Sequence, residues 1–470
     1  MSSSRAGICG IFGAMETRFV YPDDCIAALA TPFGESALAV IRTSGAGSIE
    51  SLAKLTENPE SLEKAGGNTM VFGYLKDPDT SEQIDQVMFG IFRAPKSYTG
   101  EDSVEMYCHG SIPGIDRILQ TLFSHGFRQA QGGEFTLRAF LNGKMDLTQA
   151  EAVHELVTAR TRTAQHLALG RLKGSIYHQI DGYKKLLIRV QAGVSIQLDY
   201  PDDEVEEIPW DFEVLDRIQK GLETLLASYS TGRLFQEGVV VALAGRTNAG
   251  KSSLFNLFLK EDRSIVSAIP GTTRDYIEAP LSLKGVPVKL YDTAGLRVIE
   301  ESIEQEGIRR TTQVMGRSDC ILYLVDGTQG LTPEDEEQLA TWEQRPLIRV
   351  WNKIDAEGVL RTPAGFLPLS ATTGEGFSSL EDRLYTEAVK SRGAGLEGTD
   401  AVIDSARQKR CLEDTLGALA DLQQGIAQRM PLDALALDLQ RALGALGEIT
   451  GEVTREDILD AMFSGFCVGK

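Results

Sequence analysis

The chain has 470 residues, of which 42% are hydrophobic and 24% are charged, and its formal net charge at pH 7 is −20. This length and composition predict a globular protein of about two to four domains, and no run of about 18 apolar residues predicts a membrane-spanning helix. The negative charge argues against broad, non-specific binding of nucleic acids, so a nucleic-acid partner would have to meet a local basic surface.

The N-terminal part of the chain is predicted to form an α+β domain over residues 25–142. It follows an extension, residues 1–24, whose apolar stretch is too short and interrupted for a signal peptide. Within the domain, Ala37–Gly45 has the apolar run and final turn of a buried strand, and Ile112–His125 has the periodicity of a helix.

Residues 143–236 and 387–470 have a helical pattern, and we expect them to pack together as one helical domain. Near the start of the first part, Thr148 is followed three residues later by Glu151, which is a capping-box pattern. Leucines of the second part recur at helical spacing; they are Leu412, Leu416, Leu419, Leu422, Leu432, Leu435, Leu439, Leu443 and Leu446.

Between these helical parts, residues 237–386 change to alternating strands and helices. The run VVVALAG is a continuous apolar strand of the kind found in parallel sheets covered on both faces. Further strands are predicted at Val286–Tyr291, Cys320–Val325, Leu347–Trp351 and Phe366–Leu369. The predicted fold is therefore a Ras-like α/β domain inserted into the helical domain, and residues 391–400 are the linker back.

The segment GRTNAGKS, residues 245–252, fits the phosphate-binding loop pattern and lies between a predicted strand and a predicted helix. The glycines let successive backbone N–H groups face the phosphates, Lys251 reaches the β and γ phosphates, and the Ser252 hydroxyl binds Mg²⁺. The residues of this loop assigned to GTP are Asn248, Ala249, Gly250, Lys251, Ser252 and Ser253.

Four further motifs follow in the order expected of a GTP-binding domain. GTTRD (271–275) would supply a threonine to Mg²⁺, and DTAG (292–295) an aspartate to Mg²⁺ and a glycine amide to the γ phosphate. NKID (352–355) would bind guanine through its aspartate, and the SA pair (370–371) through a backbone amide. The residues assigned to GTP here are Asp292, Thr293, Ala294, Gly295, Asn352, Lys353, Asp355, Ser370 and Ala371.

The position that holds a water-orienting glutamine in Ras-like proteins is Leu296, which cannot orient water. Hydrolysis is therefore either very slow or assisted by another residue. The next segment offers glutamates that are either a solvated helix face or a source of the water-positioning group; they are Glu300, Glu301, Glu304 and Glu306. Arg246 and Arg274 are candidates for stabilising transition-state charge, or for structural ion pairs.

The loop asparagine, GTTRD, DTAGLR, the inserted domain and the C-terminal FCVGK resemble the MnmE (TrmE) family of tRNA-modification GTPases, from about residue 25 to Lys470. The segments TPFGESALAVIRTSG, YTGEDSVEMYCHG and GEFTLRAFLNGKMDLTQAEA are similar to the family's N-terminal and early helical signatures. Two departures are Thr247, where the family usually has proline, and Glu35–Ser36, where it is richer in glycine and arginine.

The resemblance implies a cytoplasmic homodimer that works with the flavoprotein MnmG (GidA) in a heterotetramer or larger complex. The complex would add an aminomethyl or carboxymethylaminomethyl group to C5 of the wobble uridine of certain tRNAs. The implied cofactors are GTP, Mg²⁺, K⁺ and 5-formyl-tetrahydrofolate or methylene-tetrahydrofolate. Hydrolysis of GTP would be stimulated by K⁺ and coupled to dimerisation of the GTP-binding domains, and the N-terminal domain would bind the folate and form the homodimer.

The family's functional residues match positions of this sequence. The resemblance assigns folate binding to Arg42, Glu105, Lys144 and Lys470. It assigns K⁺ binding to Asn248, Ser267, Ile269 and Thr272, and Mg²⁺ binding to Ser252 and Thr273; Ser267, Thr272 and Thr273 also count among the GTP contacts. It selects Glu304 as the glutamate that positions water.

Cys467 matches the family's essential cysteine. Its C-terminal setting imitates a prenylation signal, but Gly469 and Lys470 are outside the usual residues of that signal. The cysteines show no C-x-x-C spacing, which favours a reducing compartment over a disulfide; they are Cys9, Cys25, Cys108, Cys320, Cys411 and Cys467. We expect a catalytic or cofactor-proximal thiol that either adds to uracil C6 or serves elsewhere in the reaction.

An alternative is a ribosome-assembly or regulatory RNA-binding GTPase without modification chemistry, which would need neither a terminal cysteine nor a folate-binding domain. The sequence does not locate a tRNA-binding surface. Its two short basic clusters are interpreted as solvated helix faces; they consist of Lys184, Lys185 and Arg189, and of Arg407, Lys409 and Arg410.

Overall fold

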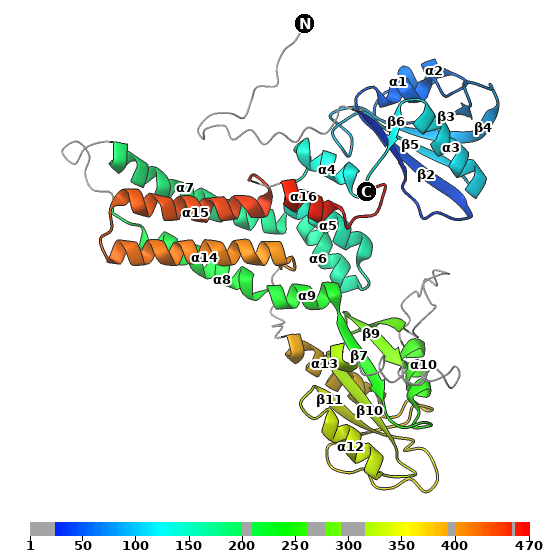
Figure 1. The fold of residues 1–470 in the computed structure, drawn as a ribbon, viewed down its shortest axis with the longest axis vertical. Coiled ribbons are helices and arrows are strands. Elements are labelled where there is room, and N and C mark those ends of the chain that lie inside the picture. The colour runs from blue at the N-terminus through cyan, green and yellow to red at the C-terminus, as the bar shows by residue number, and fades with distance from the viewer. Residues whose placement is uncertain (1–23, 200–208, 262–277, 293–314, 393–400, 454–455) are drawn as a thin grey trace. The chain divides into compact units, whose positions relative to one another are not determined.

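A computed structural model describes the chain except for residues 1–23, 200–208, 262–277, 293–314, 393–400 and 454–455 (Figure 1). The chain divides into two compact units. The N-terminal unit contains the residues up to Asp146 and those from Thr454 onward, and the second unit contains Leu147–Val453. In the described part of the chain, no helix combines the length and apolar character needed to cross a membrane.

The N-terminal unit contains a six-stranded sheet with the order β3-β4-β5-β2-β1-β6. Its strands are β1 (Cys25–Leu29), β2 (Ser36–Ser44), β3 (Thr69–Lys76), β4 (Gln83–Phe92), β5 (Ser103–Gly110) and β6 (Phe127–Gln129). Among the described strands of this sheet, β1 and β6 pair in parallel and the other neighbours pair antiparallel. The helices are α1 (Ser48–Ala53), α2 (Pro59–Glu63), α3 (Ile112–Ser124), α4 (Glu134–Leu141) and α16 (Glu456–Phe463). The α+β prediction is confirmed, and the predicted strand and helix coincide with β2 and α3 to within a residue.

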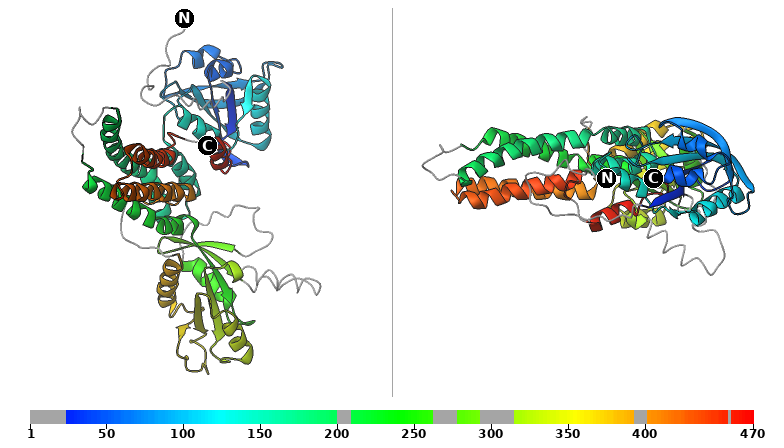
Figure 2. Two further views of the ribbon diagram at one scale, coloured as in Figure 1. Left: turned by 60° about the vertical axis from the view of Figure 1, so that its left-hand side comes forward. Right: turned by 90° about the horizontal axis from the view of Figure 1, so that it is seen from above.

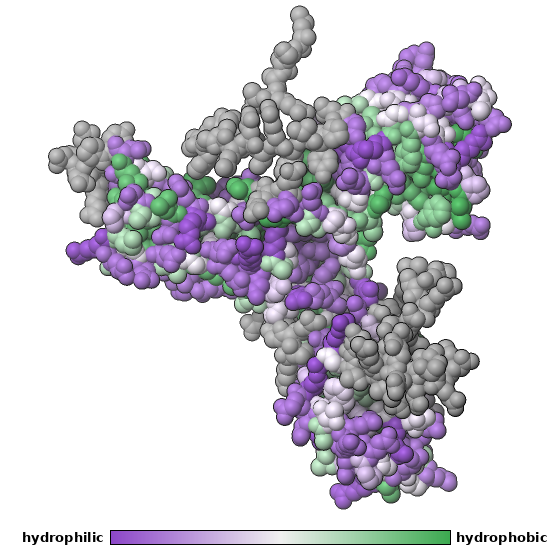
Figure 3. Space-filling view, in the orientation of Figure 1, coloured by the Kyte–Doolittle hydropathy of each residue, from purple (hydrophilic) through white to green (hydrophobic). Residues whose placement is uncertain are grey.

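The two faces of this sheet differ. Side chains of one face, such as Ile41, Phe89 and Met106, form a core with α1, α2 and α3. Strand residues alternate between the two faces of a sheet, so their neighbours point to the other face. Large apolar side chains are exposed there; they include Leu38, Met70, Phe72 and Met88. Figure 3 shows hydrophobic residues gathered on the surface of this unit.

The helical part of the second unit consists of antiparallel neighbours with α15 between α7 and α14 (Figures 1 and 2). The helices are α5 (Leu147–Thr158), α6 (Arg162–Leu172), α7 (Ser175–Asp199), α8 (Phe212–Ala227), α9 (Tyr229–Glu237), α14 (Ala406–Ala427) and α15 (Leu432–Thr450). The leucine repeats predicted from the sequence face their common core, where Leu412, Leu439 and Leu446 are fully buried.

The capping-box prediction for the helical part is wrong, and the prediction of solvated basic clusters is wrong for Arg407 and Lys184 but agrees with the exposed Lys185 and Arg410. Thr148 is not the cap of its helix, because α5 already begins at Leu147, and the Glu151 carboxylate binds Arg407 and Gln408 of α14. Arg407 is therefore not on a solvated face. Lys184 is also buried, in an ion pair with Glu452. Both errors arise because a partner distant in sequence binds the charged group.

Between α9 and α14 lies an α/β domain whose sheet has the order β12-β11-β10-β7-β9-β8. Its strands are β7 (Val239–Ala244), β8 (Glu278–Leu283), β9 (Val286–Asp292), β10 (Cys320–Asp326), β11 (Leu347–Asn352) and β12 (Phe366–Leu369). The described helices are α10 (Lys251–Glu261), α12 (Pro333–Thr341) and α13 (Phe377–Arg392). The predicted Ras-like domain is confirmed; the sequence missed β8, an antiparallel edge strand paired with β9.

Candidate functional site

The nucleotide motifs lie at one edge of the α/β sheet. The phosphate loop follows β7, Asp292 ends β9, Asn352 ends β11 and Ser370 follows β12. These four strands run parallel, so their carboxyl ends meet at the same edge. In open α/β sheets this edge is where ligands bind.

Two glycines of the phosphate loop cannot carry a side chain. Gly245 has a φ of +128°, and a Cβ there would lie 2.2 Å from the Leu324 carbonyl oxygen. Gly250 has a φ of +99°, and a Cβ there would lie 2.1 Å from Asn352 Nδ2. Asn248 also has a positive φ, of 63°, a conformation that asparagine tolerates better than most residues. The turn therefore depends on its glycines for both conformation and space.

Two polar side chains at the end of the loop, Lys251 and Ser252, have defined partners. Lys251 is buried, and its Nζ donates to the carbonyl oxygens of Gly245 and Arg246 at 2.7 and 2.6 Å. The Ser252 hydroxyl donates to Asp292 Oδ2 at 3.0 Å. A hydroxyl and a carboxylate in contact supply the oxygen ligands that Mg²⁺ requires, and the lysine supplies positive charge for phosphate. The residues present therefore fit a magnesium–nucleotide ligand.

Asn352 joins the phosphate loop to the SA pair. Its Nδ2 donates to the Ala249 carbonyl oxygen at 2.8 Å, and its Oδ1 accepts from the Ala371 N–H at 3.0 Å. Asp355, three residues later, has an exposed side chain. The amide of Asn352 thus holds the two loops together, while the carboxylate of Asp355 faces solvent, where a base can reach it.

Asp326, at the end of β10, is a residue of this edge that the sequence analysis missed. Its Oδ2 accepts from Lys353 Nζ at 2.6 Å, and Lys353 has a positive φ of 66°. Burial by itself would raise the pKa of Asp326, but the hydrogen bonds from Lys353 and Thr328 outweigh it and lower that pKa. The signal available in the sequence was an aspartate that ends a predicted apolar strand of the same sheet.

Several predicted residues lie outside the described part of the chain. They are Ser267, Ile269, Thr272, Thr273, Arg274, Thr293, Ala294, Gly295, Leu296, Glu300, Glu301, Glu304 and Glu306. Their roles remain predictions. Of the two candidate arginines, Arg246 is described, and its Nε lies 3.3 Å from Glu334 Oε2, as expected for the ion-pair alternative.

A second group of predicted residues lies on the exposed face of the N-terminal sheet. Arg42 of β2 is the register partner of Glu105 of β5, and its Nε and Nη2 donate to Glu105 Oε1 at 3.0 and 2.7 Å. The Tyr107 hydroxyl donates to the other carboxylate oxygen at 2.9 Å. Burial, with a further contribution from Glu105, raises the pKa of Tyr107. The guanidinium also lies over the rings of Tyr98 and Phe135.

The end of the chain reaches this same group. Arg42 Nη1 donates to the Gly469 carbonyl oxygen at 3.1 Å, and the Lys470 N–H donates to the Cys467 carbonyl oxygen at 3.3 Å. Lys144 lies in the same unit, where its Nζ donates to the Pro95 carbonyl oxygen at 2.8 Å. Arg42, Glu105 and the chain end are thus in direct contact, whereas the described contact of Lys144 is to a loop.

The Cys467 thiol differs from the other described cysteines. It is exposed, whereas Cys25, Cys108, Cys320 and Cys411 are buried. Burial raises the thiol pKa of Cys108 and Cys411 to about 11 and that of Cys320 to about 12. A thiol reacts as its thiolate, so these three are unreactive near neutral pH.

Comparison with known proteins decides the family. A model described as "MnmE helical domain" matches residues 147–467, and one described as "GTP-binding protein TrmE N-terminus" matches residues 25–144. The chain is 41% identical over 463 residues to a tRNA modification GTPase MnmE of Treponema denticola, covering 95% of this chain and 98% of the relative. It is 38% identical to that of Carboxydothermus hydrogenoformans, covering 95% and 100%.

The chain belongs to the MnmE (TrmE) family. The resemblance found from its motifs is thereby confirmed over nearly the whole length. MnmE membership also agrees with the described architecture, in which an α+β domain is followed by helices that flank a Ras-like domain.

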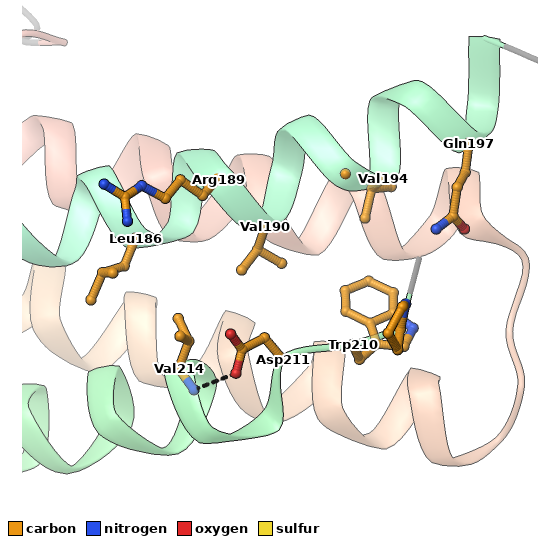
Figure 4. A pocket seen from close by; sticks show the side chains of 10 residues that line it. Leu186, Arg189, Val190, Val194, Gln197, Trp210, Asp211 and Val214 are labelled. Atoms are coloured by element: carbon orange, nitrogen blue, oxygen red, sulfur yellow. Dashed lines mark hydrogen bonds between the residues drawn. The ribbon is translucent and has the colours of Figure 1, made fainter. Parts of the chain in front are cut away.

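One cavity lies apart from all these residues. It has a volume of about 200 Å³ and lies between α7 and the start of α8 (Figure 4). Leu186, Val190 and Trp210 supply apolar lining, and Arg189 and Asp211 supply charge. None of the residues predicted for GTP or folate lines it, so we do not place the MnmE chemistry there.

Proposed function

We propose that the chain is a GTP hydrolase that acts with a flavoprotein partner on certain tRNAs. The pair adds an aminomethyl or carboxymethylaminomethyl group to C5 of the wobble uridine, using a folate one-carbon donor. The observation that carries the proposal is a near full-length match to tRNA modification GTPases in a chain whose guanine-nucleotide motifs meet at one sheet edge.

The contacts at the sheet edge support the nucleotide roles. Lys251 supplies charge to the phosphates, and Ser252 and Asp292 supply oxygen atoms for Mg²⁺. When bound, Mg²⁺ neutralises phosphate charge. Asp355 selects guanine, because its carboxylate accepts hydrogen bonds from both N–H groups of the base edge. Asn352 holds the phosphate loop and the SA pair together through its hydrogen bonds to Ala249 and Ala371.

The hydrolytic step relies on residues assigned from the family. Glu304 positions the attacking water in place of the missing glutamine. Asn248, with a side chain exposed at the loop surface, contributes an amide oxygen to K⁺. The remaining K⁺ ligands are Ser267, Ile269 and Thr272, and Thr273 completes the Mg²⁺ set. Bound K⁺ adds positive charge beside the phosphates and so stimulates hydrolysis.

The N-terminal unit is the proposed folate site. Arg42 has more N–H donors than its contacts with Glu105 and Gly469 use, so it can bind a further anionic or carbonyl group. Glu105 presents a carboxylate to the donor edge of a pterin. Lys144 and Lys470 provide additional positive charge within the same unit. These residues fit a ligand with both a carboxylate tail and a hydrogen-bonding ring.

Two assemblies belong to the proposal. The first is a homodimer formed through the N-terminal unit, which the exposed apolar side chains of β2, β3 and β4 support. The second is a complex with the flavoprotein and tRNA. Cys467 acts in the uridine chemistry, which the exposure of its thiol and the contact of its tail with Arg42 support.

Turnover of GTP in KCl and in NaCl tests the nucleotide part of this proposal. We expect GTP turnover to be at least several-fold higher in K⁺, because the smaller Na⁺ fits oxygen ligands spaced for K⁺ less well. We also expect GTP turnover to change when the flavoprotein is added. Equal turnover in the two salts would remove Asn248 from a cation site. A chain that turned over GTP but left tRNA nucleosides unmodified would favour the alternative of an RNA-binding GTPase.

A further inference from the structure

The C-terminal tail, residues 464–470, is held on both sides of Cys467 by the N-terminal unit. Val468 forms an isolated antiparallel bridge with Gly132, and the Gly133 N–H donates to the Cys467 carbonyl oxygen at 3.3 Å. Before the thiol, the Phe466 side chain is buried beside the ring of Phe463. The backbone of the tail is therefore docked, while the thiol itself is exposed.

Glycines make this docking possible. A Cβ at Gly132 would lie 2.7 Å from the Phe466 carbonyl oxygen, although its φ is not in the left-handed region. On the tail, Gly469 has a φ of +93°, and a Cβ there would lie 2.6 Å from the Leu29 carbonyl oxygen. Backbone meets backbone at both points, so a side chain at either position has to displace the tail.

Arg42 holds the tail beyond the thiol through its bond to the Gly469 carbonyl oxygen. The guanidinium is itself fixed by two hydrogen bonds to Glu105 and by its position over the rings of Tyr98 and Phe135, at 5.4 and 5.6 Å from their centroids. A charged, planar group with this many contacts has little rotational freedom. The last residues of the chain are thereby attached to a rigid part of the sheet.

We propose that Gly132 and Gly469 are positioning residues that hold the tail carrying Cys467 against the N-terminal sheet, where Arg42 of the Arg42–Glu105 pair binds it. Residues 464–470 form no helix or strand, so without these contacts the thiol would adopt many orientations. A misplacement of about 1 Å can cost about 100-fold in rate. The inference rests on the proposed function, since the position of the thiol matters only if Cys467 acts in the modification. It adds that Arg42, a residue of the proposed folate site, also binds the tail that carries the thiol.

The test compares Gly132→Ala with Gly465→Ala. The control also adds one Cβ near the tail, but that atom would meet the Met462 carbonyl oxygen at an ordinary 3.8 Å. Carboxypeptidase B measures tail release through removal of Lys470, followed by mass spectrometry. We expect Gly132→Ala to lose Lys470 at least about tenfold faster than wild type, and its kcat for tRNA modification to fall at least about tenfold. GTP turnover and the midpoint of thermal unfolding stay at wild-type values, and Gly465→Ala matches wild type throughout.

Gly469→Ala provides a second test, because its added Cβ would collide with the Leu29 carbonyl oxygen at the other tail contact. Faster release of Lys470 with slower modification is again expected. If neither glycine variant releases Lys470 faster, or if the tail is released while modification proceeds at the wild-type rate, the positioning role is wrong. A Cys467→Ser chain with normal modification would instead refute the function of the thiol, whatever the glycine variants show.

Discussion

The nucleotide site and the tail contact are assembled in different ways. Each nucleotide motif is a short continuous segment at the end of a strand, and one parallel sheet brings the motifs together. The contact between Arg42 and Gly469 joins residues 427 positions apart. Local spacing is therefore informative for the first site, whereas the second depends on how the whole chain folds.

The segment by which the chain returns from the α/β domain to the helices is, like the tail, held by contacts with residues distant in sequence. Arg171 is fully buried in α6, and its Nη1 donates to the Val402 carbonyl oxygen at 2.9 Å. It also pairs with Glu155 of α5 and with Asp404. Burial, and then the charge of Asp404, raises the pKa of Glu155 to about 8 although Arg171 opposes this. The buried contacts of Arg171 thus fix the returning segment to the helices.

The largest expected effect is that of Gly250→Ala, which tests whether the nucleotide site depends on local backbone geometry. The added Cβ would collide with Asn352 Nδ2 and disfavour the positive φ. We expect affinity for GTP to fall about 100-fold or more, or about 2.7 kcal/mol, by isothermal titration calorimetry. Gly316→Ala is the control in the same domain, because a Cβ there would meet nothing within 4 Å. Wild-type affinity of Gly250→Ala would show that the loop does not bind the phosphates.

A smaller effect is expected of Asp355→Asn, which tests the base contact. The asparagine presents an N–H group where the carboxylate accepts, so a hydrogen bond to a charged group, worth about 1.5–3 kcal/mol, is lost. We expect about a tenfold to hundredfold loss of GTP affinity and a gain for xanthosine triphosphate in competition binding. Glu357→Gln, a neighbouring exposed position, should leave both affinities unchanged. An unaltered preference in Asp355→Asn would contradict the assignment.

The smallest effect concerns the contacts between distant segments. Because the pKa of Glu155 is raised in the folded chain, the folded state binds a proton that the unfolded state has already lost. Its contribution to stability is present below about pH 4.5 and is lost as pH rises toward 8. Glutamine does not titrate, so Glu155→Gln should not show this loss. The free energy of unfolding of the variant, relative to that of wild type, should therefore be higher at about pH 8.5 than at pH 5 by at least about 1 kcal/mol.

Urea unfolding at both pH values measures that difference, provided that the transition remains cooperative. Glu413→Gln is the control, because this carboxylate is half exposed on α14. A Glu155→Gln chain whose stability fell with pH as steeply as that of wild type would show that Glu155 is ionised in the folded protein.

The sequence was sufficient where chemistry fixes the spacing of neighbouring residues. The phosphate loop and NKID were found because a bound nucleotide demands particular residues at short intervals. The capping box at Thr148 was wrong because Glu151 has a stronger partner in Arg407, 256 positions away. The edge strand β8 was missed because Pro280 interrupts a short apolar pattern, and edge strands tolerate proline. Arg42 and Glu105 came from the family resemblance, since nothing local marks an ion pair between two strands.

Analysis of tRNA nucleosides tests the central claim, that a GTP-binding domain serves chemistry at the terminal thiol, most directly. Cells whose sole copy carries Cys467→Ser are compared with wild-type cells by liquid chromatography and mass spectrometry, and the purified variant is assayed for GTP turnover. The account predicts loss of the C5 modification of the wobble uridine with GTP turnover retained. Wild-type levels of the modified uridine in these cells would contradict it.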